Sequence, residues 1–274
     1  MAAGSNDFPH NNAKILYKYT PHDFGPLNVI QGDHYQNFIG GIYYVTTPRE
    51  KMVLHRLHGG KAGEYGQYWT HEPRKGNEGY RWDAAVLQQW NSLDKAATLI
   101  VQEGVNMYEG KVSKQAHYLG GGWQIFIPRE IVNLLAEIQP HKMAERGYNE
   151  TFIKQKIHEI NTAQQKIMQE YNDKLTKRIE QRALQHGSEL WNLPPEIRKV
   201  VQGDGSNKSD GKVKTGSYVV HRDSIPVPGG GRKNISVSVK IEFVRSDTRT
   251  YQSGKTIITE TTNYYNRITE IRET

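Results

Sequence analysis

The sequence predicts an α+β protein in which a β-rich N-terminal unit is followed by a long helix and a small antiparallel β segment. Short apolar runs that end at glycine or proline, typical of strands, recur through residues 13–128. Residues 151–185 repeat apolar side chains every three, four or seven positions, as an amphipathic helix does. Residues 235–243 alternate strictly between apolar and polar, which indicates a strand with one buried face.

The composition limits the classes of function. A chain of 274 residues exceeds one minimal domain, and we expect two units. The absence of cysteine excludes a disulfide, a thiolate nucleophile and a cysteine-based zinc site. The formal net charge of +7 favours an anionic partner, such as a nucleic acid, a membrane surface, a phosphorylated ligand or an acidic protein. Solubility explains the charge equally well.

The sequence contains no recognisable targeting or membrane segment. It has no apolar run long enough to span a bilayer, and residues 1–12 are small and polar instead of basic and then apolar. We therefore expect a flexible leader over 1–12, no signal peptide, no transmembrane segment and a soluble protein.

Five strands and two helical segments are expected in the N-terminal unit. The strands are placed where short apolar runs are bounded by glycine or proline, at 14–19, 38–45, 52–58, 97–103 and 123–127. One to three helical turns are expected over 83–93. Pro128 opens a helix that runs to Ile138, because proline suits the first helical position, and Pro140 stops it.

The helix expected over 151–185 would be about 50 Å long at 1.5 Å per residue, longer than a small domain is wide. Its apolar face consists of Ile153, Ile157, Ile160, Ile167, Tyr171, Leu175 and Ile179. Such a helix could project, lie along a groove, pair with another chain or bind a delivery or carrier protein. Packing within the same chain is the default expectation.

The expected domain boundaries follow from these patterns. A catalytic unit over 13–147 precedes the helix region over 148–201. Residues 202–216 are rich in Gly, Ser, Asp and Lys, which predicts a flexible linker. A small antiparallel β region over 217–274 would contain strands at 235–243, 255–264 and 266–272.

Three strings in the N-terminal unit stand in a fixed order. They are HRLHGG at 55–60, GQYWT at 66–70 and GGGWQIFIP at 120–128. Together they resemble the toxin domains of the ADP-ribosyltransferase superfamily in bacterial polymorphic toxins. In those domains an arginine on the first core strand precedes a glycine-rich turn, a Trp-Thr or Ser-Thr strand and a late strand with Glu or Gln. The resemblance spans 53–128, under a third of the chain.

The resemblance implies a split β-sheet unit that takes NAD+ or NADP+ as its substrate and uses no metal. It also implies a bacterial effector that is delivered into a target cell, and a producing cell that needs an immunity protein. Hydrolysis of the nicotinamide–ribose bond, as by an NAD+ glycohydrolase, is the leading expectation. Mono-ADP-ribosyl transfer to a protein or nucleic acid is the alternative.

Arg56 is the candidate phosphate anchor. A guanidinium held on a strand can bind two oxygens of a pyrophosphate at once and stays charged at any relevant pH. Gly59 and Gly60 lack side chains that would keep phosphates away from backbone N–H groups. The alternative is an edge-strand arginine followed by an ordinary hairpin turn.

Tyr68 and Trp69 are candidates for binding the nicotinamide ring, whose positive charge favours an aromatic face. Adjacent strand residues point to opposite faces, so only one of the two should meet the ligand. Core packing is the alternative for Trp69. Thr70 shares a face with Tyr68 and could bind the nicotinamide ribose or pair across the sheet.

Gln124 is the candidate catalytic residue. Cleavage passes through an oxocarbenium-like state, so a polar group that holds the ribose hydroxyls is the natural catalytic element. The resemblance implies a Glu here in transferases, whereas Gln adds no negative charge and favours hydrolysis. Glu103 is the rival acid, with a solvated charge at a strand end as its alternative.

His55 could line the pocket and carry a proton near neutral pH, and a surface role is its alternative. His58 lies three residues further along the strand, on the opposite face, so the pair shares no metal ion. The sequence contains no Walker-type phosphate loop, Gly-x-Ser-x-Gly elbow or dinucleotide-binding fingerprint.

The basic residues near the C-terminal end lead to a third hypothesis, a non-enzymatic nucleic-acid-binding or assembly protein. They are Arg232, Lys233, Lys240, Arg245, Arg249 and Lys255, interleaved with Tyr251, Tyr264 and Tyr265. Cations with aromatic side chains between them suit a nucleic-acid backbone and its bases. A solvated face of a small sheet explains them equally well.

Overall fold

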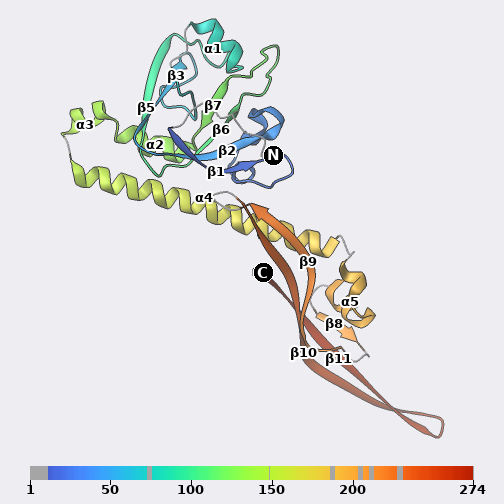
Figure 1. Ribbon diagram of the computed structural model, residues 1–274. Helices are drawn as coiled ribbons and strands as arrows, with labels where there is room; N and C mark the ends of the chain where they lie inside the picture. The colour runs from blue at the N-terminus through green and yellow to red at the C-terminus, as the bar shows by residue number, and fades with distance from the viewer. Residues whose placement is uncertain are drawn as a thin grey trace, which may run out of the picture. The chain divides into compact units, whose positions relative to one another are not determined.

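The protein is an α+β protein whose chain divides into two compact units (Figure 1). The computed structural model describes residues 12–72, 76–147, 149–185, 189–202, 206–209, 213–226 and 231–273. The first unit comprises residues 1–172 with 226–231, and the second comprises 173–225 with 232–274. The expected leader over 1–12 lies outside the described residues except for Asn12.

The first unit contains two antiparallel sheets. The larger sheet has the order β1 (Ala13–Tyr19), β2 (Tyr43–Pro48), β6 (Met107–Lys111), β7 (Trp123–Phe126) and β4 (Tyr68–Trp69). The smaller sheet pairs β3 (Met52–His58) with β5 (Lys95–Val101). A single bridge between His55 and Thr70 joins β3 to the strand end of β4. Among the described residues, this bridge is the only backbone pairing between the two sheets.

Each face of the larger sheet has its own core. Trp69 and Ile125 face a cluster that includes helix α2 (Arg129–Glu137). Tyr68 and Phe126, their neighbours along the strands, face a second, aromatic cluster with Tyr19. This second cluster lies on the side of the short helices η1 (Pro26–Asn28), η2 (His34–Asn37) and η3 (Ile39–Gly41).

Local patterns placed several elements well. Strand β3 matches the prediction over 52–58, and α2 matches the helix opened by Pro128. The strand predicted over 38–45 is confirmed only from Tyr43, because Gly40 and Gly41 adopt φ of 62° and 67° within η3. Pro140 stops α2 and also begins α3 (Pro140–Arg146).

Of the helix of one to three turns predicted over 83–93, the structure has a single hydrogen-bonded turn, in which the Asn91 N–H donates to the Leu87 carbonyl at 3.2 Å. Helix α1 (Asn77–Asp83) ends where that helix was expected to begin. Ala85 and Leu93 have φ of 47° and 61°, values that no right-handed helix accepts, and both side chains are buried. Burial of these apolar side chains in an irregular segment therefore overrides the helical propensity of the stretch.

Helix α4 (Glu150–Gln185) matches the long helix predicted over 151–185. Ile160 and Ala163 are buried in the core cluster beneath α2. The polar residue that interrupts the apolar stripe, Gln164, is buried as well and serves as a tether. Its Oε1 accepts from the Asn106 N–H at 2.5 Å, and its Nε2 donates to the Gly104 carbonyl at 3.2 Å.

The second unit is built on a sheet with the order β8-β11-β10-β9. Its elements include helix α5 (Pro195–Gln202) and strands β8 (Ser206–Ser209), β9 (Gly216–Pro226), β10 (Arg232–Ser253) and β11 (Thr256–Glu273). The two strands predicted at 255–264 and 266–272 form one strand, β11. With β10 it makes a hairpin closed by the two residues Gly254 and Lys255.

The prediction of a flexible linker over 202–216 was wrong in its centre. Ser206–Ser209 form β8, which pairs with Asn263–Asn266 of β11. Polar strands of this kind gain backbone hydrogen bonds from a neighbouring strand without burying apolar area, so composition alone does not reveal them. The flanking residues 203–205 and 210–212 lie outside the described part.

Within the described part of the chain, no helix has the length and apolar character that crossing a membrane requires.

Replacing Gln164 with Ala should lower the free energy of unfolding by about 2 kcal/mol, because a buried N–H and a carbonyl lose their partners. Chemical denaturation followed by circular dichroism measures the change. Gln165→Ala is the matched control, since Gln165 is exposed on the same helical turn. Equal stability of the two variants would show that the tether contributes nothing.

Candidate functional site

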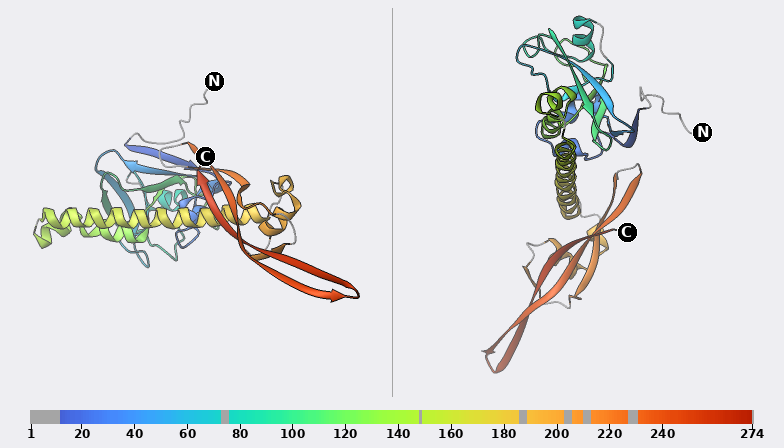
Figure 2. Two further views of the ribbon diagram at one scale, coloured as in Figure 1. Left: turned by 90° about the horizontal axis from the view of Figure 1, so that it is seen from below. Right: turned by 90° about the vertical axis from the view of Figure 1, so that its left-hand side faces the viewer.

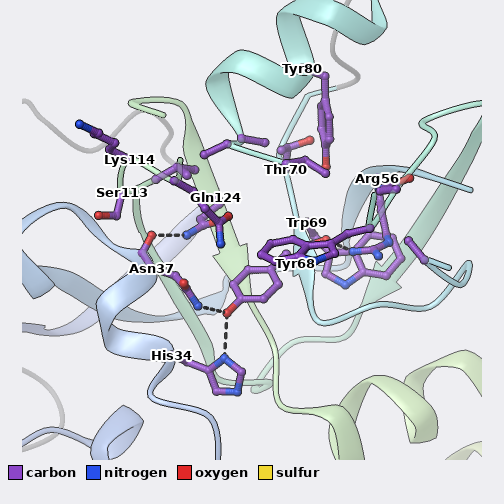
Figure 3. A pocket seen from close by; sticks show the side chains of 18 of the residues that line it. His34, Asn37, Arg56, Tyr68, Trp69, Thr70, Tyr80, Ser113, Lys114 and Gln124 are labelled. Carbon is purple, nitrogen blue, oxygen red and sulfur yellow. Dashed lines mark hydrogen bonds between the residues drawn. The ribbon is translucent and has the colours of Figure 1, made fainter. Parts of the chain in front are cut away.

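The first unit contains a cavity of about 420 Å³ beside the bridge between the two sheets (Figure 3). This volume is typical of sites for small organic ligands. Strands β3, β4 and β7, helix η2, the segment from α1 to Asn91 and the loop after β6 form its walls. Polar and aromatic side chains that line it include His34, Asn37, Arg56, Tyr68, Thr70, Tyr80, Lys114 and Gln124.

Arg56 presents a cation to this cavity from the core-facing side of β3. Met52 and Leu54 of the same strand face are buried in the apolar core, and Arg56 follows them where the core gives way to the cavity. Its Nη1 donates to the Tyr68 carbonyl at 2.9 Å. Its Nε is buried without a hydrogen-bond partner among the described residues.

The surroundings of Arg56 favour an anion. Burial lowers the pKa of the guanidinium, and Arg129 adds like-charge repulsion, yet the group remains a cation at neutral pH. None of the described residues that line the cavity is an Asp or Glu, and Lys114 adds a second cation. A buried cation without a counterion is costly, and an anionic ligand would relieve that cost.

Gly66 allows the guanidinium to lie against the backbone. A Cβ at this position would stand 2.2 Å from Cζ of Arg56, far inside van der Waals contact. Gly63, three residues earlier, has open space at the same point. Gly66 is therefore the residue whose lack of a side chain gives Arg56 its position.

Tyr68 occupies the middle of the cavity, between Arg56 and Gln124 in the view of Figure 3. Its hydroxyl accepts from Asn37 Nδ2 at 2.5 Å and lies 2.8 Å from Nδ1 of His34. Burial raises the pKa of Tyr68 to about 12 and lowers that of His34, so both rings are neutral at pH 7. These contacts hold the phenol ring in one orientation.

Gln124 projects from β7 on the same sheet face as Tyr68 and is buried. Its Nε2 donates to the main-chain carbonyl of Asn37 at 2.8 Å. A carbonyl can only accept, so this contact fixes the orientation of the amide. Oε1 makes no hydrogen bond within the described residues and is the atom left to accept from a ligand.

Trp69 and Thr70 border the cavity without offering free polar atoms. The Trp69 ring is fully buried in the core, and its Nε1 donates to the Gly66 carbonyl at 2.7 Å. The Trp69 ring therefore packs in the core, which was the alternative to binding the nicotinamide ring. The Thr70 hydroxyl lies within hydrogen-bond distance of the His55 and Glu72 carbonyls.

Four other sequence candidates do not line the cavity. His55 is on the opposite face of β3 and contributes main-chain bonds to Thr70. Glu103 is exposed in the turn after β5. Gly59 and Gly60 form a turn against Ser92 and Asp94, and a Cβ on Gly59 would stand 1.6 Å from Oδ1 of Asp94. The glycine pair thus serves a tight turn, as the alternative reading expected.

The cavity also includes residues that no sequence pattern indicates. His34 and Asn37 belong to η2, in a stretch rich in Gly, Pro and Asp that predicts only loop. Tyr80 comes from α1, which was placed too late in the chain. Arg81 secures this wall from behind by donating to the Val86 and Asn91 carbonyls at 3.2 and 3.1 Å. No short-range pattern signals these contacts.

A buried carboxylate lies behind the cavity, on the other face of the sheet. Glu109 is fully buried and accepts from His71 Nε2 at 2.7 Å, from Trp123 Nε1 at 3.0 Å and from the Thr46 hydroxyl. Three converging donors suit a carboxylate, which has acceptor sites for all of them. Glu109 does not line the cavity.

No cluster of His, Cys, Asp or Glu among the described residues has the arrangement of a metal site. Comparisons of the chain with protein-family models, with curated proteins and with solved structures found no match.

Glu109→Ala should destabilise the protein by about 3 kcal/mol, because it leaves buried donors without an acceptor. Glu103→Ala removes an exposed carboxylate from a neighbouring loop and should change stability by less than about 0.5 kcal/mol. Denaturant titrations of both variants provide the comparison. Similar losses of stability in the two variants would contradict the expectation that the buried acid stabilises the fold more than the exposed one.

Proposed function

We propose that the protein cleaves the nicotinamide–ribose bond of NAD+ or NADP+, with the cavity of the first unit as its active site. The observation that carries the proposal is Arg56, a half-buried cation that faces the cavity with no carboxylate beside it. A dinucleotide supplies the missing anion as a pyrophosphate. Further support comes from the three strings that resemble ADP-ribosyltransferase toxin domains, which supply Arg56, Tyr68 and Gln124 to the same cavity.

Arg56 anchors the pyrophosphate in this proposal. Nη1 is held by the Tyr68 carbonyl, while Nε and Nη2 have no partner among the described residues. The Nε–Nη2 edge of a guanidinium matches two oxygens of one phosphate. An arginine therefore suits the position better than a lysine, whose ammonium is a point charge.

Tyr68 receives the nicotinamide ring. Arg56 and Tyr68 line the same cavity, so a ligand anchored at Arg56 can extend toward the phenol with its nicotinamide half. An aromatic face stabilises the positive charge of the oxidised nicotinamide. The bonds from His34 and Asn37 keep the phenol ring oriented before the ligand arrives.

Gln124 binds the nicotinamide ribose through its free Oε1, which accepts from a ribose hydroxyl. The C–N bond breaks with its electron pair moving to nicotinamide, and positive charge develops on the ribose. A carbonyl oxygen aimed at the ribose hydroxyls stabilises that charge. Water then adds its oxygen to the anomeric carbon and loses a proton to solvent, giving ADP-ribose.

The same residue favours hydrolysis over transfer. A glutamate would add a negative charge near the ribose and could take a proton from an acceptor side chain. Neutral Gln124 positions the ribose without serving as a base. The nearest buried carboxylate in this sheet, Glu109, is on the opposite face and holds three donors of its own.

Incubation of the purified protein with NAD+ should release nicotinamide and ADP-ribose in equal amounts. Arg56→Ala should lower kcat/KM about a hundredfold through loss of the charged hydrogen bonds, and Arg56→Lys should restore only part of it. Gln124→Ala should lower kcat by about 10²-fold. Glu103→Ala, which alters the exposed rival acid, should retain activity.

Chromatography of the small-molecule products measures all four variants. Absence of turnover by the wild type, with cell lysate present as a source of acceptors, would contradict cleavage of either kind. Labelled ADP-ribose attached to lysate protein or nucleic acid would instead establish transfer. Full activity of Gln124→Ala would remove Gln124 from the mechanism.

Gly66→Ala should displace the Arg56 guanidinium and raise KM for NAD+ by about tenfold, since its Cβ would overlap Cζ. Gly63→Ala, which meets nothing within 4 Å, should leave KM unchanged. Steady-state kinetics compare the two, and circular dichroism verifies that both fold. Equal KM values would mean that the position of Arg56 against Gly66 is not needed for binding.

A further inference from the structure

The β10–β11 hairpin extends as a two-stranded ribbon beyond the parts of the sheet formed with β8 and β9 (Figures 1 and 2). We call residues 243–262 the distal ribbon. Every residue of β10 from Phe243 to Ser253 is exposed, whereas residues 235–239 of the same strand are buried. Strand β9 has 11 residues against the 22 of β10, so it can cover only half of that edge.

The distal ribbon lacks the packed apolar face that normally stabilises strands in water. A two-stranded hairpin without a packed face is marginally stable, and the free edge of β10 presents unpaired N–H and C=O groups. Phe243 and Tyr251 are 51% and 46% exposed on it. A third strand added at the β10 edge would satisfy the backbone groups and cover these rings.

The charges along β10 match those of a second copy of the same strand. Asp247 and Arg249 stand two residues apart on one face of the exposed stretch. When a strand pairs with its own copy in antiparallel fashion, residues equally far before and after the centre face each other. The exposed stretch 243–253 is centred on Thr248, so full-length pairing opposes Asp247 to Arg249 of the second copy, twice.

Moving the centre of the pairing by one residue, which shifts the register by two, destroys this match. Pairing centred on Asp247 would oppose Asp247 to its own copy and Arg245 to Arg249 of the second copy, which are like charges. Pairing centred on Thr248 also sets Arg245 opposite Tyr251 of the second copy, a cation beside an aromatic ring. Cross-strand charge pairs of this kind favour one register over others.

The ionic contacts within one copy leave the charges of Asp247 and Arg249 largely uncompensated. Arg249 forms no ion pair among the described residues. Its cross-strand neighbour Glu260 accepts instead from the Tyr251 hydroxyl at 2.8 Å. Asp247 has only a long contact to Arg245, at 3.6 Å between Nη2 and Oδ2. The corresponding edge of β11 offers no such match, because its residues 256–262 contain Glu260 and no basic residue.

The basic residues of the second unit are mostly paired with local acceptors, which favours a protein partner over a nucleic acid. Lys233 contacts Glu273, Lys240 contacts Glu242, and Arg232 contacts Ser224. We infer that the β10 edge of the distal ribbon pairs with the same edge of a second copy of this chain, antiparallel about Thr248. The resulting two-copy assembly joins two hairpins into one four-stranded ribbon.

Sedimentation velocity of the full chain, from about 1 µM to about 1 mM, should show reversible dimers, and the range covers the weak affinity of a small interface. Arg249→Asp or Asp247→Arg turns both charge pairs into like-charge pairs and should weaken association at least tenfold. The mixture of these two variants is complementary again at both pairs and should associate as strongly as the wild type.

Two controls separate pairing from other effects. Lys255→Glu changes the net charge as much as Arg249→Asp does, but it lies in the hairpin turn and should leave association intact. The double variant Asp247→Arg with Arg249→Asp exchanges the charges and should also dimerise. Circular dichroism establishes that each variant is folded.

Several results would overturn the inference. These are a wild type that stays monomeric throughout the range, an Arg249→Asp variant that dimerises normally, or a mixture no stronger than its components. Association that disappears on nuclease treatment would also overturn it and would establish nucleic acid as the partner.

Discussion

The main-chain bridge between His55 and Thr70 is the contact on which the candidate site depends. Each of the two residues donates its N–H to the carbonyl of the other at 2.8 Å, and no other backbone pairing joins the two sheets within the part of the first unit that the structure describes. Because side chains alternate along strands, this register puts Arg56 opposite Trp69, and its guanidinium reaches the main-chain carbonyl of Tyr68. The cavity lies beside the bridge, and Arg56 of β3 and Tyr68 of β4 are among the residues that line it.

A second constraint is the energetic cost of Arg56 itself. A guanidinium removed from water with one backbone acceptor and a buried, unpartnered Nε is less stable than one in solvent. Gly66 is what makes the close fit permissible, because any side chain there would displace Cζ. Side chains that lack hydrogen-bond partners persist where the surrounding structure holds them in place, and they occur often at sites where a ligand completes their hydrogen bonds. The proposed pyrophosphate would supply the missing acceptors.

Elements with strong local patterns could be predicted from the sequence, and those defined by distant contacts could not. Strand β3, helix α2 and helix α4 follow apolar periodicity and proline positions, and the structure has them within a residue or two of the predicted bounds. Helix α1 and strand β8 contradict the local patterns, because burial of Ala85 and pairing with β11 decide those segments.

The same distinction applies to the cavity. Arg56 and Gln124 belong to strands β3 and β7, which periodicity identifies, whereas the short strand β4 with Tyr68 is not among the strands predicted from apolar runs. His34 and Asn37 contact Tyr68 across more than thirty residues of chain from a segment without periodicity. Gly59 and Gly60 have the sequence of a phosphate-binding turn. The residues that pack against them, Ser92 and Asp94, are far away in sequence, so the sequence does not reveal that this space is filled.

The alternation of side chains along the strands determines which polar groups of the larger sheet face the cavity. Gln124 is opposite Gly110 in the β6–β7 pairing, and the neighbouring pair is Ile125 with Glu109. A shift of one residue in β6 would turn Glu109 toward the cavity and offer an acid where an amide now stands. The three donors bound to Glu109 hold it on the other face. The pairing of β6 with β7 therefore keeps the acid out of the cavity and leaves Gln124 facing it. In the proposed reaction this neutral amide faces the ribose, so the reaction ends in hydrolysis.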